Sequence, residues 1–312
     1  MSLDRAVELA RAARGRAHPK PTVGAVLVRD GEIVGEGVTE ARGRHAEIVA
    51  LDAAGERARG ATLYVTLEPC AHHGTTPPCV DAIVAAGVAR VVVGALDPNS
   101  EAAGGADRLR GAGVEVALVD SFASRALNEA WRTWVTLGRP FVTYKAAVTL
   151  DLRVTVPGSR WVSGEESRRL VHELRAASDA VAVGAGTARA DRPRLDVREV
   201  ETPRGQPRRL VFSRGESSDG LDLEVRSGPL EDELRALGAD GVQSLLLEGG
   251  PTLATAFLAA DLVDKLMLFV APLVSGDGPV AIGALASPRT FTRLTATPVG
   301  DDVLLEAYVH EP

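Results

Sequence analysis

The first 138 residues alternate between segments with apolar residues at helical spacing and short apolar runs typical of strands. The pattern predicts helices over 3–14, 45–59 and 80–86, strands over 23–28, 32–37, 61–67 and 88–95, and a further helix and strand within 107–119. Asp30-Gly31 lies between the first two strands, which is typical of a hairpin. Strands and helices in this order predict an α/β sandwich.

A second α/β segment follows. A helix containing Trp131 and Trp134 is expected to end near Gly138, so we predict a first domain over 1–138 and a second over 139–312. The second domain has predicted strands over 141–147, 180–184, 209–212, 244–248 and 265–270, a helix over 165–176, and a polar loop over 213–228. Ser163 and Glu166 have the spacing of a capping box for that helix.

Composition and charge narrow the functional class. The 312 residues have a formal net charge of -7, so a nucleic-acid binder acting through a broad basic face is not expected. The chain contains two cysteines, too few for a disulfide framework. Acidic residues near the N-terminus and the absence of a long apolar run favour a cytoplasmic protein with no membrane partner, in which the thiols stay reduced.

Both cysteines lie in the run Pro69-Cys70-Ala71-His72-His73-Gly74-Thr75-Thr76-Pro77-Pro78-Cys79, and His45-Ala46-Glu47 opens a predicted helix. His45, Cys70 and Cys79 are a suitable set of three ligands for one Zn²⁺, which leaves the fourth position open for a water whose pKa the metal lowers. Glu47 would then move a proton from that water to the substrate and on to a leaving amine.

The order of these residues matches the zinc-deaminase signature, His-x-Glu followed by a Pro-Cys pair. Eight residues separate the cysteines here instead of two, which excludes the ordinary cytidine-deaminase pattern and indicates a narrower family. Two other interpretations stay open at this point. The cysteines can be small buried hydrophobic residues, and His72 and His73 can be ligands of a structural site.

The second half contains two glycine-rich turns after apolar strands, Glu248-Gly249-Gly250 and Gly184-Ala185-Gly186-Thr187. Such turns allow a phosphate to approach the N-terminus of the next helix. The Gly-x-Gly-x-x-Gly motif of Rossmann domains is absent. Arginines are dense between residues 153 and 198 in this acidic chain, and guanidinium groups suit the phosphate of a ribose-phosphate substrate.

With these motifs in view, the chain resembles the bifunctional riboflavin-biosynthesis deaminase/reductase family over nearly its whole length. The run from Tyr64 to Cys79, with its long cysteine spacing, and Asp97-Pro98-Asn99 resemble the deaminase half. Ser159-Arg160-Trp161, Leu174-Arg175-Ala176, the run from Gly186 to Arg198, and Glu248-Gly249-Gly250 resemble the reductase half.

The resemblance implies a cytidine-deaminase-like α/β/α sandwich followed by a dihydrofolate-reductase-like domain. It implies deamination of a phosphoribosylaminopyrimidine with one Zn²⁺, NADPH reduction of the ribosyl group to ribityl, and a homo-oligomer, either a dimer or a tetramer. The implied substrate contacts are Ser159, Arg175, Leu195, Arg198 and Glu248. The implied NADPH contacts are Ala147, Trp161, Thr187, Asp191, Ser213, Gly250, Pro251, Thr252, Leu253, Ala254, Thr255 and Ala256.

The chain departs from the family pattern at a few positions. Lys20 replaces an Asn, Val49 a His and Leu152 a Gly, and the loop after Asn99 lacks the usual Pro and Arg. These differences leave two alternatives open. One is a zinc deaminase for another aminopyrimidine with an impaired or repurposed reductase domain, in which Leu152 crowds the cofactor. The other is a non-catalytic binding protein in which zinc is a structural element.

Overall fold

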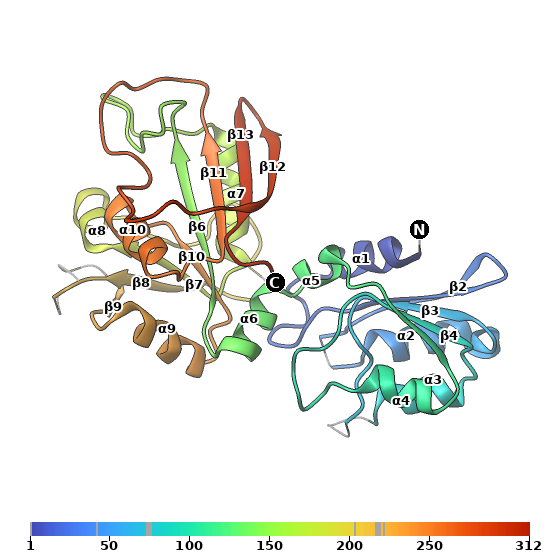
Figure 1. Cartoon of the computed structure of the whole chain (residues 1–312). Coiled ribbons are helices and arrows are strands. Elements are labelled where there is room, and N and C mark those ends of the chain that lie inside the picture. The colour runs from blue at the N-terminus through green and yellow to red at the C-terminus, as the bar shows by residue number, and fades with distance from the viewer. Residues whose placement is uncertain (1, 42, 73–76, 203, 216–219, 221) are drawn as a thin grey trace. The chain divides into compact units, whose positions relative to one another are not determined.

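The computed structural model describes residues 2–41, 43–72, 77–202, 204–215, 220 and 222–312. The chain forms two compact units, the first over residues 1–137 together with Pro312 and the second over 138–311 (Figure 1). Each unit has a sheet of its own and a hydrophobic core of its own.

The first unit contains a five-stranded sheet in the order β2-β1-β3-β4-β5. β1 and β2 form an antiparallel hairpin in which Asp30 and Gly31 both have positive φ, as the predicted turn requires. β3 runs antiparallel to β1, whereas β3, β4 and β5 are parallel. The strands are β1 (Gly24–Arg29), β2 (Glu32–Val38), β3 (Thr62–Val65), β4 (Arg90–Val93) and β5 (Glu115–Leu118).

Helices cover both faces of this sheet, which gives the predicted sandwich. A Cβ atom on Gly24 would lie 2.0 Å from the carbonyl oxygen of Ala6 in α1, and one on Gly37 would lie 2.2 Å from that of Ala46 in α2. Gly37 pairs with Ala25, the neighbour of Gly24, so the two glycines point to opposite faces. The helices are α1 (Ser2–Ala12), α2 (Ala46–Ala54), η1 (Gly55–Ala58), α3 (Cys79–Ala85), α4 (Gly105–Gly111), α5 (Phe122–Ala126) and α6 (Glu129–Leu137).

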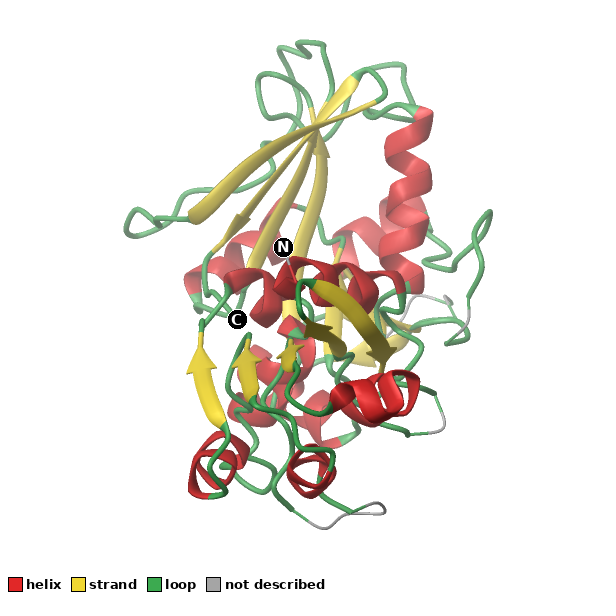
Figure 2. Cartoon of the chain, turned by 90° about the vertical axis from the view of Figure 1, so that its right-hand side faces the viewer, coloured by secondary structure: helices red, strands yellow, loops and turns green. Residues whose placement is uncertain are grey.

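The second unit contains an eight-stranded sheet in the order β12-β13-β11-β6-β10-β7-β8-β9, with helices packed beside the strands (Figure 2). The six strands from β11 to β9 are parallel, and β13 and β12 are antiparallel additions at one edge. The strands are β6 (Phe141–Val148), β7 (Ala180–Gly184), β8 (Arg208–Phe212), β9 (Glu224–Arg226), β10 (Ser244–Leu247), β11 (Lys265–Val270), β12 (Thr292–Val299) and β13 (Asp302–Tyr308).

Alternate residues of β7 face two different hydrophobic clusters. Ala180 and Ala182 pack in the main core with residues of α9 and α10, whereas Val181 and Val183 pack with residues of α7 and α8. Successive side chains of a strand point to opposite faces, so a strand buried on both faces reads as a continuous apolar run. The helices are α7 (Glu165–Ala176), α8 (Ala185–Asp191), α9 (Leu230–Ala239) and α10 (Pro251–Ala259).

Two local predictions for the second unit were wrong. The N-cap of α7 is Gly164, and no side chain of the helix caps it, so Ser163 and Glu166 form no capping box. The carboxylate of Asp302 in β13 takes that role, because its Oδ2 accepts hydrogen bonds from the Gly164 N–H at 2.8 Å and the Ser167 hydroxyl at 2.6 Å. The predicted loop over 213–228 contains the short strand β9.

None of the described helices is long and apolar enough to cross a bilayer.

Candidate active sites of the two units

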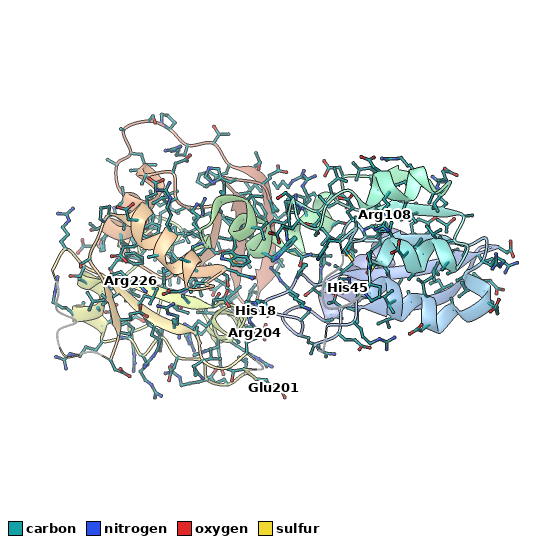
Figure 3. All side chains as sticks on the ribbon, turned by 90° about the horizontal axis from the view of Figure 1, so that it is seen from below. His18, His45, Arg108, Glu201, Arg204 and Arg226 are labelled. Atoms are coloured by element: carbon teal, nitrogen blue, oxygen red, sulfur yellow. The ribbon has the colours of Figure 1, made fainter. Side chains whose placement is uncertain are left out.

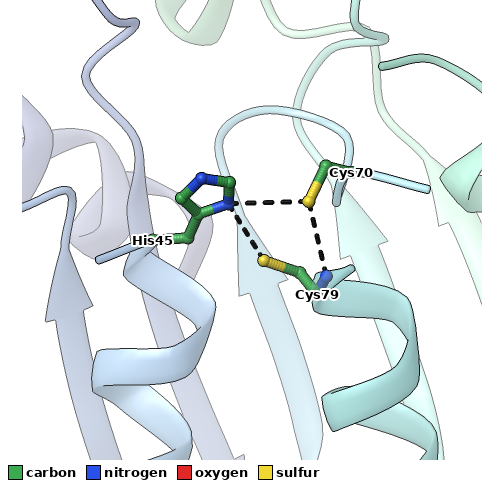
Figure 4. A group of neighbouring side chains, drawn as sticks. All are labelled: His45, Cys70 and Cys79. Atoms are coloured by element: carbon green, nitrogen blue, oxygen red, sulfur yellow. Dashed lines mark hydrogen bonds between the residues drawn. The ribbon is translucent and has the colours of Figure 1, made fainter. Parts of the chain in front are cut away.

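Three potential metal ligands converge in the first unit (Figure 4). Among the described residues, His45, Cys70 and Cys79 form one group whose donor atoms all lie within 4.8 Å of one another. The Nδ1 atom of His45 is 3.1 Å from the sulfur of Cys79 and 3.5 Å from that of Cys70. One imidazole and two thiol groups are a donor set that suits Zn²⁺.

The N-termini of two helices and the loop after β3 bring these side chains together. His45 is the N-cap of α2, Cys79 is the first residue of α3, and Cys70 follows β3. The backbone N–H of Cys79 donates to the sulfur of Cys70 at 3.4 Å. Arg108 of α4 (Figure 3) connects the two cysteine-containing segments, because it donates to the Ala71 carbonyl at 2.8 Å and to Asp81 at 2.6 Å.

The two thiols have opposite pKa shifts. The pKa of Cys70 is lowered to about 4, because the thiol of Cys79 and then His45 interact favourably with its thiolate. The pKa of Cys79 is raised, because it shares a proton with Cys70 and is buried. The pair therefore favours a thiolate at Cys70, which is the form that binds metals.

Glu47 lies in the first turn of α2, two residues after His45, and its side chain is buried. It lines a cavity of about 450 Å³ together with His45 and Cys70. Burial raises the pKa of Glu47 to about 7. The carboxyl group is thus placed beside the proposed metal ligands and next to the space where a substrate would bind.

Other residues that line this cavity were not predicted as site residues. Asp97 and Asn99 come from the loop after β4, and Trp131 and Trp134 come from α6. Burial raises the pKa of Asp97 to about 6. Asp97 and Asn99 belong to the Asp-Pro-Asn run on which the resemblance partly rests, whereas the tryptophans gave no signal beyond their apolar character.

The positions that depart from the family pattern differ in their relation to the cavity. Lys20 lines it, as does Ala102 in the loop after Asn99. Val49 instead packs against β2, since its Cβ would lie 2.9 Å from a Cβ on Gly37. His72 lines the cavity without belonging to the metal-ligand group, and residues 73–76, including His73, lie outside the described residues.

The second unit has a cavity of about 650 Å³ at the carboxyl ends of β6, β7 and β10. This is the usual position of ligand sites in parallel sheets. Most of the residues that the resemblance implied line it: Ala147, Trp161, Arg175, Thr187, Asp191, Arg198, Glu248, Gly250, Pro251, Thr252 and Leu253.

Six implied residues are not part of the cavity lining: Ser159, Leu195, Ser213, Ala254, Thr255 and Ala256. Leu195 and Ala254 are buried in the hydrophobic clusters. The Ser159 hydroxyl donates to the carbonyl of Trp161 at 2.8 Å, which places it beside a lining residue. Leu152 is half-exposed and does not line the cavity either, so its side chain does not crowd this space.

A largely buried group of charges forms the polar centre of the second cavity. The guanidinium of Arg175 donates to both carboxylate oxygens of Glu248, at 2.5 and 3.0 Å, and to the carbonyl of Asp196 at 3.1 Å. The ammonium of Lys145 is 3.6 Å from the same carboxylate. Burial alone would raise the pKa of Glu248, but Lys145 and Arg175 outweigh it and hold the pKa below its ordinary value.

Lys145 is the main residue of this group that sequence reasoning missed. Its pKa is lowered by burial, and Glu248 opposes that shift only in part. A lysine in the middle of the apolar strand β6 was the available signal, because a charged residue is rarely buried without a partner.

The ring of Trp161 contacts two arginines at the cavity. The guanidinium carbons of Arg160 and Arg168 are 5.0 and 5.2 Å from the centre of its ring. Both arginines also line the cavity. Cation–π contacts of this kind orient the guanidinium groups and add positive charge to a site that suits anionic ligands.

Family models match both units. Residues 2–95 match the cytidine and deoxycytidylate deaminase zinc-binding region, and residues 140–305 match the RibD C-terminal domain. The chain therefore combines a cytidine-deaminase-like domain with a RibD reductase domain, as the sequence predicted.

Two relatives match nine tenths of the chain or more. "Riboflavin biosynthesis protein RibD" of Aquifex aeolicus is 40% identical over 316 residues, which covers 90% of this chain and 88% of that protein. The protein of the same name from Mycobacterium tuberculosis (strain H37Rv) is 42% identical over 323 residues, covering 96% and 94%.

Among solved structures, a diaminohydroxyphosphoribosylaminopyrimidine deaminase/5-amino-6-(5-phosphoribosylamino)uracil reductase from Thermotoga maritima matches with a TM-score of 0.83. It is 34% identical, and the match covers 98% of this chain and 97% of that one.

Proposed function

The chain belongs to the RibD family of riboflavin biosynthesis proteins, as a bifunctional deaminase and reductase, and we propose the reaction and the residues that each unit contributes. The first unit deaminates 2,5-diamino-6-(5-phosphoribosylamino)pyrimidin-4-one by hydrolysis. The second reduces the ribosyl group of the deaminated product to ribityl with NADPH. The main support is the convergence of His45, Cys70 and Cys79 beside the buried Glu47 at one cavity.

His45, Cys70 and Cys79 would hold one Zn²⁺. The donor types fit this metal, and three protein ligands are the number found in catalytic zinc sites, where one position remains open. When bound, Zn²⁺ lowers the pKa of a water and makes a nucleophile available at neutral pH.

Glu47 is the proposed proton carrier of the deaminase. Its carboxylate takes the proton from the attacking water, passes it to the pyrimidine ring nitrogen, and a proton then leaves with the amine as ammonia. Trp131 and Trp134 provide apolar walls for a flat pyrimidine, and Lys20 provides a positive charge at the same cavity for the substrate phosphate.

In the second unit, reduction adds a hydride to C1′ of the ribosyl group and requires a proton at the oxygen released when the ring opens. Lys145 places a largely buried ammonium group in this cavity and is the proposed donor of that proton. Arg175 positions Glu248 from the other side, and Arg198 is the proposed contact to the substrate phosphate.

The nicotinamide cofactor is proposed to bind along Gly249 and Gly250 and the first turn of α10. The N-terminus of a helix preceded by glycines suits a pyrophosphate. A preference for NADPH over NADH is part of the proposal, and so is a homo-oligomer, a dimer or a tetramer. The strand β12 is exposed along almost its whole length at the edge of its sheet, which supports pairing with another chain.

The alternatives left open by the sequence gain no support from the family matches. A purely structural zinc site would not explain a buried, non-ligating Glu47 beside the open side of the ligand group. Leu152 lies outside the cavity lining, so its side chain does not fill the space proposed for the cofactor.

The experiment that tests this function follows both reactions with the purified chain. We expect ammonia release from the diaminopyrimidine substrate without NADPH, and oxidation of NADPH when the deaminated product is supplied. Light scattering measures the oligomer in the same preparation. Deamination of other aminopyrimidines in preference to this one would refute the proposed substrate.

A further inference from the structure

The loop between α8 and β8 has an unusual backbone where it borders the second cavity. Arg192, Leu195 and Glu199 all have positive φ, at 43°, 53° and 69°. Residues other than glycine rarely adopt a positive φ. Such a backbone conformation is kept only where contacts with the surrounding residues stabilise it. Arg198 lies in this loop and lines the cavity, so its position depends on whatever fixes the loop.

Two residues of α7 hold the loop by its backbone. Arg175 donates to the carbonyl of Asp196 at 3.1 Å. One turn earlier in the helix, Nδ1 of His172 is 3.2 Å from the backbone nitrogen of Arg198 and accepts its hydrogen. The side chain of Gln206 completes the attachment with two bonds to Val197, at 2.7 and 3.1 Å.

The bond to Arg198 determines the protonation state of His172. Because Nδ1 accepts a hydrogen, the proton of the neutral ring is on Nε2. The ring is buried, and burial together with Arg175 and Arg198 lowers its pKa, so it stays neutral. His172 also lines the cavity, and its Nε2 has no hydrogen-bond partner among the described residues.

We propose that His172 is a positioning residue of the reductase site, which fixes the backbone of Arg198 through Nδ1 and donates from Nε2 to the phosphate of the ribosyl substrate. A phosphate accepts hydrogen bonds only, so a neutral ring that presents an N–H is a suitable partner. Arg198 is 42% exposed, and its one ion pair within the described part of the chain is with Asp196, so its charge remains accessible to the same phosphate. The inference rests on the proposed function, since it assumes a phosphorylated substrate.

The test compares three substitutions in the full chain. His172→Phe keeps a flat ring but removes both hydrogen-bonding atoms, and we expect the KM for the phosphorylated substrate to rise about tenfold or more with kcat changed little. His172→Gln can accept at one atom and donate at the other, so it should restore most of the affinity. Glu173→Gln, the exposed next residue of the same helix, is the matched control and should behave as wild type.

Ammonia release and the KM for NADPH should be unchanged in all three variants, which reports that the protein is folded. The dephosphorylated substrate should bind the wild type and the His172→Phe variant almost equally. If His172→Phe fails to fold, His172→Asn replaces it, because its shorter amide cannot reach both partners.

An unchanged KM in His172→Phe, a His172→Gln variant no better than His172→Phe, or an equal loss with the dephosphorylated substrate would each overturn the inference. Failure of the proposed function has a different signature. In that case the wild-type chain itself would not oxidise NADPH with the deaminated product.

Discussion

The carboxyl group of Glu47 lies beside three potential zinc ligands and is not one of them. Changing it therefore tests the deaminase mechanism without removing a ligand. The substitution Glu47→Gln keeps the size and hydrogen-bonding capacity of the side chain and removes its ability to carry a proton. We expect ammonia release to fall by about 100-fold or more. A colorimetric ammonia assay with the diaminopyrimidine measures this.

The control for Glu47→Gln is internal to the chain. Zinc content and NADPH oxidation with the deaminated product should match those of the wild type, because the three ligands and the second unit are untouched. Ammonia release at the wild-type rate would exclude Glu47 from the mechanism.

Arg175 and Arg198 have the same implied role by resemblance, but the structure gives them different surroundings. Arg175 donates to both carboxylate oxygens of the largely buried Glu248, whereas Arg198 is half-exposed. We expect Arg175→Ala to destabilise the second unit by about 1–3 kcal/mol, because it removes two charge-assisted hydrogen bonds to a largely buried carboxylate that keeps Lys145 as its partner. Arg198→Ala should instead raise the KM for the phosphorylated substrate by roughly one to two orders of magnitude.

Thermal unfolding and steady-state kinetics of the two variants separate these effects. The dephosphorylated substrate serves as the control for Arg198→Ala and should be bound almost as by the wild type. A stable Arg175→Ala variant whose only defect is substrate affinity would show that Arg175 contacts the phosphate instead of positioning Glu248.

At the scale of single residues, the sequence predicted those parts of the sites that lie within short motifs. His45, Glu47, Cys70 and Cys79 occupy two such motifs and were found together. Lys145 was missed because its partner Glu248 is more than 100 positions away, and no local pattern links the two. No local sequence pattern predicts the hydrogen bond between His172 and the backbone of Arg198 either.

At the scale of elements, the same limit explains why the cap of α7 was predicted wrongly. Ser163 is local to the helix, but the side chain that accepts hydrogen bonds at its N-terminus is that of Asp302, which β13 supplies. We expect Asp302→Ala to lower the free energy of unfolding of the second unit by about 1–2 kcal/mol, the usual effect of losing an N-cap. Chemical denaturation followed by circular dichroism measures the change.

Ser163→Ala is the matched control for Asp302→Ala, and its stability should stay within about 0.5 kcal/mol of the wild type. If Ser163→Ala lowered the free energy of unfolding more than Asp302→Ala, the capping box that the sequence predicted would be supported instead.

The apolar pattern predicted the exact bounds of some elements. Other elements have no apolar pattern from which they could be predicted. β7 and β11 have the predicted bounds, and α7 spans the predicted 165–176. The predicted helix over 45–59 ends at Ala54, because Gly55 adopts a positive φ and the chain continues as a short 3-10 helix. β12 was missed because nearly all of its residues are exposed, so it has no apolar alternation.

At the scale of the whole molecule, each unit has its own core, and the cores share no residue. Cys70 and Cys79 are themselves core residues of the first unit, so metal binding there should be coupled to its stability. The second unit has its charged site and its cavity within residues 138–311. Loss of zinc should therefore abolish deamination by the first unit and leave reduction by the second unit unchanged.

Metal removal tests this independence in the intact chain. A strong chelator, or the substitution Cys79→Ala, should abolish ammonia release. It should also lower the unfolding temperature of the first unit, because the core around Cys70 and Cys79 loses the metal that stabilises it. Oxidation of NADPH with the deaminated product should continue at the wild-type rate, since none of the residues around Lys145 and Glu248 depends on the metal. Calorimetry reports the unfolding transitions and the two assays report the activities.

Restoring Zn²⁺ after chelation should recover deamination in the wild type and fail in Cys79→Ala, which separates loss of the metal from irreversible damage. A chelated protein that loses both activities together would show that the second unit requires the folded first unit.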